Sequence, residues 1–185
     1  MIYLADARER GVRPICQVMG SVVANSAYHG TRLDVGHICS VMEELISRAE
    51  KQWGISRHEI APQTVFVSHE TYTPARGGSA SAEVMALRNV FQGAADQIVV
   101  ANTKGFTGHT LGAAGGIEAV ASVLQLSRGF VHGSINCEDV HPEIKDFSDR
   151  IPRKCLEMPD LRVIAKAGFG FGDVNSCLIF RKWEA

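Results

Sequence analysis

The stretch that decides the fold is N-T-K-G-F-T-G-H-T-L-G-A-A-G-G-I-E, residues 102–118. It follows a short β-branched run, and small apolar residues dominate its second half. We expect a helix from Gly108 to Leu126 with hardly any polar face, and a helix that is apolar on all sides is buried on all sides. The pattern therefore predicts a central helix packed between two sheets, and it leaves open that one sheet comes from another segment or chain.

Strand and helix patterns alternate outward from this stretch in both directions. Apolar residues at helical spacing predict helices over residues 38–53 and 79–91, after the tail of a helix over 3–10. Runs rich in β-branched residues predict strands over 14–23, 64–68, 97–101, 162–166 and 176–181. We predict one α/β domain over residues 1–185, with a mixed, mostly parallel five-stranded sheet, helices on both faces and one buried central helix.

The bulk properties exclude several classes of protein. The chain has 185 residues and a formal net charge of -1, with no basic stripe, so we expect no nucleic-acid partner. No apolar run approaches a membrane span, and no signal peptide is evident, which favours the cytoplasm. The five cysteines are far apart and form no C-x-x-C pair, so we expect reduced thiols and neither a metal site nor a redox site.

A histidine follows one of the predicted buried strands. His69 lies in V-S-H-E-T-Y-T-P, residues 67–74, at the carboxyl end of the strand over 64–68. Ligands of open α/β sheets bind at that edge. The alternative is a histidine that only satisfies the hydrogen bonds of a loop, and a single histidine at a strand end does not decide between the two.

A second histidine and a lysine belong to the deciding stretch. We place His109 in the first turn of the predicted central helix, where the positive end of the helix dipole disfavours a charged imidazole. A neutral ring can then donate a hydrogen bond. Lys104 stands beside a helix whose only acid is Glu118, so the two residues either form a buried pair or Lys104 faces solvent.

A glycine-rich segment, G-F-G-F-G-D-V-N, occupies residues 168–175. A dinucleotide-binding loop needs a helix to follow it, whereas a strand is predicted here, so we reject that interpretation. The segment suits either a tight turn whose backbone N–H groups face a ligand or an ordinary hairpin with buried aromatic rings. For residues 5–32, with Tyr28 and His29, we expect only a structural role.

Each motif alone is weak, but their order is specific. H-x-T-x-T-P, then T-K-x-x-T-G-H-T-x-G-A-A-G-G-x-E, then G-F-G-F-G-x-x-N resembles the C-terminal half of the β-ketoacyl-(acyl carrier protein) synthase family, over nearly the whole chain. The resemblance implies a thiolase-like fold and a decarboxylative Claisen condensation of an acyl thioester with malonyl-acyl carrier protein, in fatty acid or polyketide synthesis. It implies no cofactor of its own, because the phosphopantetheine arm arrives on the acyl carrier protein. It also implies a homodimer of the complete synthase.

The resemblance also implies roles for individual residues. His69 and His109 match the two histidines that donate hydrogen bonds to the malonyl thioester oxygen as the enolate forms. Lys104 matches a lysine that supports the site through the acid at Glu118. The remaining matches concern the substrate arm and the acyl pocket: Thr71 and Thr73 match contacts to pantetheine, and Phe171, between Gly170 and Gly172, matches a gate whose N–H serves the oxyanion hole.

The chain departs from the family pattern at several points. Glu70 replaces a glycine, residues 74–79 form a longer segment that lacks the usual acid, and Asp173 and Val174 replace a G-T pair. These changes lie near the pantetheine tunnel and the gate, and they suggest a divergent subgroup.

The larger departure is the absence of a nucleophile, because the only cysteine on a predicted helix, Cys39, follows no strand. In the family the nucleophile belongs to the N-terminal half. We therefore expect an excised segment, a remnant or one half of a split enzyme, inactive alone.

Two other functions stay open. The first is a non-catalytic partner of the chain-length-factor type, although such a partner needs neither His69 nor His109. The second is half of a thiolase-type acyltransferase, although the T-G-H-T-x-G-A-A-G-G block favours a synthase.

Overall fold

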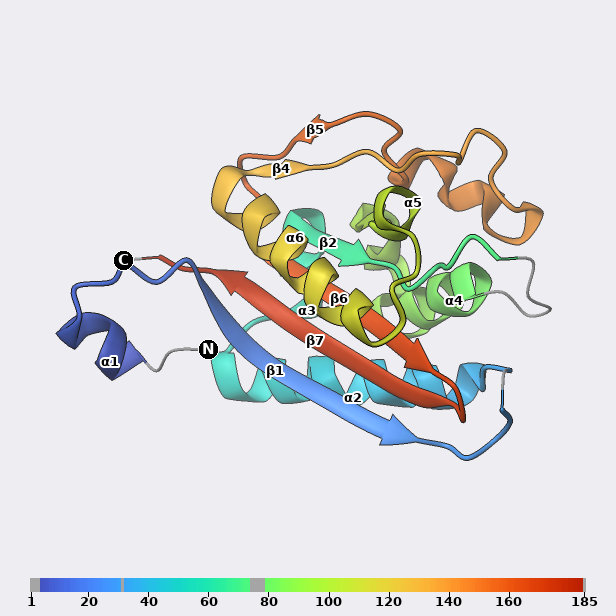
Figure 1. Ribbon diagram of the computed structural model, residues 1–185, viewed down its shortest axis with the longest axis horizontal. Helices are drawn as coiled ribbons and strands as arrows, with labels where there is room; N and C mark the ends of the chain where they lie inside the picture. The colour runs from blue at the N-terminus through green and yellow to red at the C-terminus, as the bar shows by residue number, and fades with distance from the viewer. Residues whose placement is uncertain (1–3, 31, 74–78, 185) are drawn as a thin grey trace.

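The computed structural model describes residues 4–30, 32–73 and 79–184. Its centre is a five-stranded sheet in the order β1-β7-β6-β2-β3 (Figure 1). The strands are β1 (Cys16–Asn25), β2 (Thr64–Val67), β3 (Val99–Ala101), β6 (Val163–Gly170) and β7 (Val174–Lys182). The predicted five-stranded α/β architecture is therefore confirmed.

The sheet is mixed, but it is not mostly parallel as predicted. β2 pairs in parallel with β3 and β6, while β7 pairs antiparallel with β1 and β6. The antiparallel ladders are the longer ones, because β6 and β7 extend past the predicted strands, over 162–166 and 176–181, into the glycine-rich segment. Only residues 171–173 separate the two strands, so this segment is a hairpin tip on two long strands.

Helices cover both faces of the sheet. α2 (Val35–Trp53) and α4 (Ser79–Phe91) pack against each other on one face, and α6 (Ala114–Arg128) lies across the other (Figure 1). Successive strand residues point to opposite faces: Phe66 belongs to the core beneath α2 and α4, whereas Val65 and Val67 belong to the core beneath α6. The shorter elements are α1 (Leu4–Glu9), α3 (Arg57–Ile60), η1 (Ala61–Gln63), η2 (Gln92–Gln97), α5 (Lys104–Thr107), η3 (Leu111–Ala113), β4 (Phe130–Val131), η4 (Pro142–Arg150) and β5 (Leu156–Glu157).

Local signals fix the ends of α2 as the sequence predicts. The carboxylate of Asp34 accepts the N–H of His37 at 3.1 Å, which satisfies a free donor of the first turn. Gly54 ends the helix in the left-handed conformation, with φ of 62°. The last residue, Trp53, donates its indole N–H to the carbonyl of Met19 at 2.9 Å and so ties the helix end to β1.

The predicted central helix differs in two ways. α6 begins at Ala114 rather than at Gly108, because Gly108 and Leu111 take φ values of 66° and 51°, which a continuous right-handed α-helix does not accommodate. One face of α6 packs on the sheet, but Ile117, Val120 and Leu124 form an exposed apolar stripe. The prediction of a helix buried on all sides is therefore wrong for this chain alone.

The segment that follows α6 crosses above the sheet. β4 and β5 pair antiparallel in a small second sheet, and η4 lies between them in sequence. Among the described residues, no helix is long and apolar enough to cross a membrane.

Candidate active site

A pocket of about 530 Å³ lies where the segments after β2 and α5 meet the β6–β7 hairpin. It gathers residues that are far apart in the sequence and includes all three predicted motifs. Its lining comprises Gly30, Arg32, Leu33, His69, Thr71, Thr73, His109, Leu111, Gly112, Phe169, Gly170, Phe171 and Asp173. The structure thus brings His69 and His109 into one site.

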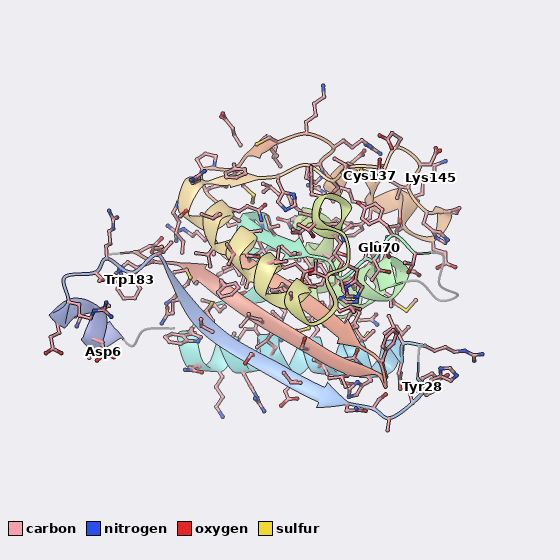
Figure 2. The ribbon with its side chains drawn as sticks, viewed as in Figure 1. Asp6, Tyr28, Glu70, Cys137, Lys145 and Trp183 are labelled. Atoms are coloured by element: carbon pink, nitrogen blue, oxygen red, sulfur yellow. The ribbon has the colours of Figure 1, made fainter. Side chains whose placement is uncertain are left out.

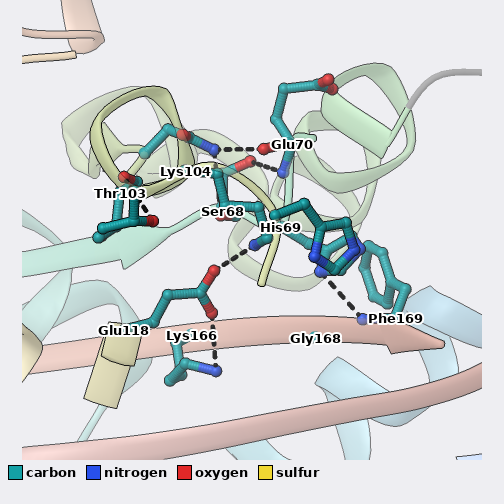
Figure 3. A network of polar contacts seen from close by, with 12 residues as sticks. Ser68, His69, Glu70, Thr103, Lys104, Glu118, Lys166, Gly168 and Phe169 are labelled. Atoms are coloured by element: carbon teal, nitrogen blue, oxygen red, sulfur yellow. Dashed lines mark hydrogen bonds and ion pairs between the residues drawn. The ribbon is translucent and has the colours of Figure 1, made fainter. Parts of the chain in front are cut away.

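His69 follows the end of β2 and is almost completely buried. The backbone N–H of Phe169 donates to its Nδ1 at 3.2 Å, and the Phe169 ring packs on the imidazole at 5.0 Å between centroids (Figure 3). Since Nδ1 accepts, the proton of the neutral ring must be on Nε2. Burial, together with the charges of Lys104, His109 and Lys166, lowers the pKa of His69 from 6.5 to about 3. The ring is therefore a neutral Nε2–H donor at physiological pH.

His109 also accepts a backbone N–H at Nδ1. It lies between α5 and η3, outside any helix, so its expected placement in the first turn of a helix is wrong. The N–H of Leu111 donates to its Nδ1 at 3.2 Å, which again leaves the proton on Nε2 when the ring is neutral. The rings of His69 and His109 stand edge to face, 5.4 Å apart.

A buried group of three charges lies beside His69. The Nζ atom of Lys104 contacts Oε1 of Glu118, so the predicted pair forms and the solvent-facing alternative is wrong. Lys166, which the motifs did not suggest, lies 3.1 Å from Oε2 of the same carboxylate. Figure 3 shows Glu118 between the two lysines. All three side chains are at most 6% exposed, so solvent screens their interaction little.

Glu83 supports the strand end that carries His69. It lies in α4, points inward and is almost completely buried. Its two carboxyl oxygens accept the hydroxyl of Ser68 at 2.6 Å and the backbone N–H of His69 at 2.7 Å. Burial raises the pKa of Glu83 from 4.5 to about 8. It therefore fixes the position of His69 while staying mostly uncharged at neutral pH.

The segment after His69 carries the two threonines. Thr71 and Thr73 line the pocket, and their hydroxyl oxygens lie 2.7 Å apart. The carboxylate of Glu70 accepts the N–H of Tyr72 at 2.8 Å and the N–H of Ala80, in the first turn of α4, at 2.9 Å. Glu70, which replaces the family's glycine, therefore ties this segment to α4. The lengthened segment, residues 74–79, lies outside the described residues except for Ser79.

The hairpin tip between β6 and β7 closes the pocket on the other side. The side chain of Phe171 is 80% exposed at the pocket mouth. The tip is held by Asp173, whose buried carboxylate accepts the Ser26 hydroxyl, and by the Gly172 N–H, which donates to the Gly30 carbonyl at 3.0 Å.

Residues 26–30 and 32–33 therefore belong to the site, which the sequence analysis missed. Tyr28 itself projects to solvent from this segment (Figure 2), and Arg32 lines the pocket. The sequence alone does not reveal this role, because it depends on the contact between Asp173 and Ser26, which lie 147 positions apart. Asp173 also departs from the family pattern.

No cysteine lies among the described residues that line the pocket. Cys39 is in α2, where its sulfur accepts from the Asn89 side chain at 3.4 Å. Cys177 is buried in β7, and burial raises its pKa to about 12. None of these thiols is poised as a nucleophile at the two histidines.

Comparisons with known proteins agree on one family. The family described as "Beta-ketoacyl synthase, C-terminal domain" matches residues 15–138. The 3-oxoacyl-[acyl-carrier-protein] synthase 2 of Staphylococcus aureus (strain COL) is 33% identical over 184 residues, which are 98% of this chain and 41% of that protein. The chloroplastic 3-oxoacyl-[acyl-carrier-protein] synthase I of Hordeum vulgare is 32% identical over 100% of this chain and 37% of its own length. The chain thus spans about two fifths of these relatives.

Solved structures show the same fold. One similar structure is that of a type II PKS acyl-carrier protein in complex with its ketosynthase. A chain of this structure superposes with a TM-score of 0.80 and 26% identity, over 98% of this chain and 42% of that one. The ishigamide ketosynthase/chain length factor superposes with a TM-score of 0.83 and 25% identity, over 98% of this chain and 41% of that one. The thiolase-like architecture is therefore established over nearly the whole chain.

Proposed function

Because this chain belongs to the β-ketoacyl synthase family, as its C-terminal domain, we propose that it supplies the enolate-stabilising half of a 3-oxoacyl-(acyl carrier protein) synthase. One observation carries the proposal. His69 and His109 share a pocket, and a backbone N–H occupies Nδ1 of each ring, so both are set to donate from Nε2. Two Nε2–H donors in one pocket are suited to an oxygen that gains negative charge during a reaction.

The proposed reaction begins with a malonyl thioester. Its carboxylate carbon leaves as carbon dioxide, and the electron pair of the broken C–C bond moves to the thioester, whose oxygen becomes an enolate. The Nε2–H groups of His69 and His109 donate to that oxygen. The lowered pKa of His69 supports a neutral ring, which accepts the Phe169 N–H at Nδ1 and donates to the oxygen from Nε2–H.

The enolate carbon then attacks the carbonyl carbon of an acyl group held as a thioester on a cysteine. A C–C bond forms, and the cysteine thiolate leaves. In our proposal this cysteine comes from the N-terminal synthase half, because none of the five thiols here stands at the pocket. The chain alone should therefore be inactive.

The substrate arm enters beside the two threonines. Thr71 and Thr73 present adjacent hydroxyl groups at the pocket wall, which suits the amides of a phosphopantetheine arm. Phe171 stands at the mouth as the gate of the acyl pocket, and Gly170 and Gly172 flank it. The partner is then an acyl carrier protein, which is also the partner of the ketosynthase in one superposed structure.

Two further features complete the proposal. We place the synthase in the cytoplasm, which agrees with five unpaired cysteines. We also propose that the complete synthase is a homodimer, as the family resemblance implies. The product is an intermediate of fatty acid or polyketide synthesis, since the similar proteins include both 3-oxoacyl synthases and a type II PKS ketosynthase.

A chain-length-factor-like partner and a thiolase-type half are the competing functions. A non-catalytic partner has no use for a buried imidazole whose tautomer is fixed, whereas His69 is held by Phe169 on one side and by Glu83 through its backbone. The family match favours a synthase over a thiolase.

The test uses this chain joined to an N-terminal half that carries the cysteine, which we call the reconstituted synthase. The assay is carbon dioxide release from malonyl-acyl carrier protein. His69→Gln and His109→Gln should each lower kcat about 100-fold or more, in the range seen when one oxyanion donor is removed. The matched control is His58→Gln, on an exposed turn of α3 far from the pocket lining. Wild-type rates in both site variants would refute the proposal.

A further inference from the structure

The buried charges beside His69 do not balance. Two ammonium groups, Lys104 and Lys166, share the single carboxylate of Glu118, which leaves one positive charge in surplus. Glu83, which accepts the backbone N–H of His69, has its pKa raised to about 8 and is mostly uncharged at neutral pH. Among the described residues, Lys104 and Lys166 pair with no carboxylate other than that of Glu118.

A surplus charge is a cost to the fold. Burying an ion without its own counter-ion removes its hydration and returns less attraction than a matched pair does. Lys104 is already matched by Glu118 at Oε1, so Lys166, at Oε2, is the lysine that the fold could lose. Its side chain is only 6% exposed, so it cannot recover hydration by extending to water. A residue that costs stability and still stands beside a reactive group indicates a functional use.

The position of Lys166 connects it to His69 through two elements. It lies on β6, in register with Val67 at the end of β2, two residues before His69. Three residues further along β6 is Phe169, whose N–H fixes the His69 tautomer. Its Nζ atom also lies near the start of α6, because a Cβ atom added at Gly115 would be 3.9 Å from it. Lys166 therefore sits where β2, β6 and α6 converge on the imidazole.

We propose that Lys166 is a positioning residue for the enolate-forming step: it holds Glu118 in place for Lys104 and supplies, behind His69, a positive charge that favours an anionic transition state. The inference rests on the function proposed above. The charge acts at a distance and favours both the neutral form of His69 and the negative charge that grows on the thioester oxygen. Lys166 does not itself touch the substrate.

The first test concerns stability and needs only this chain. Lys166→Met keeps the length of the side chain and removes the charge, so its melting temperature should equal or exceed that of the wild type. A matched control is Arg162→Gln, which removes a positive charge from an exposed pair with Glu184 just before β6 and should leave the melting temperature nearly unchanged. A clear drop in the melting temperature of Lys166→Met would overturn the inference, because Lys166 would then be a structural ion.

The second test concerns the reaction of the reconstituted synthase. Lys166→Met should lower kcat for malonyl decarboxylation about tenfold, the equivalent of one pKa unit, and leave KM for malonyl-acyl carrier protein unchanged. Acylation of the cysteine, which forms no enolate, should keep its rate. Lys166→Arg should restore much of kcat, since it restores the charge. Wild-type decarboxylation by Lys166→Met would refute the role of Lys166.

The two tests separate this inference from the proposed function. A wild-type reconstituted synthase without any decarboxylation would contradict the proposed function and, with it, the catalytic use of Lys166. The stability test would still decide whether Lys166 is surplus to the fold.

Discussion

Replacing Glu118 with glutamine should be the most damaging single change to the buried charges. Glu118→Gln keeps the size of the side chain and removes the one carboxylate that Lys104 and Lys166 share. The side chains of Glu118 and Lys104 are 2% and 1% exposed, so neither lysine can be rescued by solvent. Breaking a buried pair from one side costs about 3–5 kcal/mol. For a chain of this size, that loss lowers the melting temperature by about 10 °C.

The assay is urea unfolding followed by circular dichroism, at neutral pH. The matched control is Glu44→Gln, the same chemical change in an exposed pair with Arg48 on α2, which should cost at most about 1 kcal/mol. Adding Lys166→Met to Glu118→Gln should restore part of the lost stability, because one of the two uncompensated charges disappears. Raising the pH toward 10 should help the single variant, since a buried ammonium without a partner can release its proton. A loss below about 1 kcal/mol in Glu118→Gln would refute the view that these charges are tightly coupled.

Three further predictions concern other parts of the molecule. Glu83 holds a proton when folded, because its pKa is about 8 against 4.5 when unfolded, so the stability it contributes is present below pH 4.5 and is lost as the pH rises through 8. Glu83→Gln should remove a slope of up to about 1.4 kcal/mol per pH unit from the free energy of urea unfolding between pH 4.5 and 8, and an unchanged slope would contradict the raised pKa. Gly133→Ala would place a methyl group 2.7 Å from the backbone nitrogen of Lys154, so we expect the free energy of unfolding to fall by about 1–3 kcal/mol, as measured by thermal unfolding. The control Gly93→Ala, which has open space around it, should cost almost nothing, and equal effects of the two changes would be inconsistent with this close approach. The exposed apolar stripe of α6 should bind a hydrophobic dye, and Val120→Lys should reduce the fluorescence; a dye-silent wild type would count against an uncovered packing face.

The sequence predicted the fold well wherever periodic patterns are long. α4 and the end of α2 were placed to the residue, because their apolar positions recur at helical spacing and Gly54 ends α2, whereas α2 starts three residues before the predicted helix over 38–53. The helix that contains the deciding motif was placed less well. Its composition suggested burial on every side, but composition does not say which chain packs against the exposed face. The start of α6 was also misplaced, because it depends on the backbone conformation of Gly108 and Leu111.

The site was predicted in part. The motifs identified His69, His109 and the Lys104–Glu118 pair because the order of those motifs is specific. Lys166 was missed because a lysine inside a predicted strand carries no signal of burial until its carboxylate partner is known. The expected place of His109 in the first turn of a helix was also wrong, and the bond from the Leu111 N–H to its Nδ1 was not predicted because it depends on a local turn.

The central claim is that this chain holds the enolate-stabilising half of a synthase and takes its nucleophile from elsewhere. The most direct test measures carbon dioxide released from malonyl-acyl carrier protein by three samples: this chain alone, the N-terminal half alone, and the reconstituted synthase. We predict turnover only in the third sample, with its loss in His69→Gln. Turnover by the isolated chain, or reconstituted activity that survives His69→Gln, would contradict the claim.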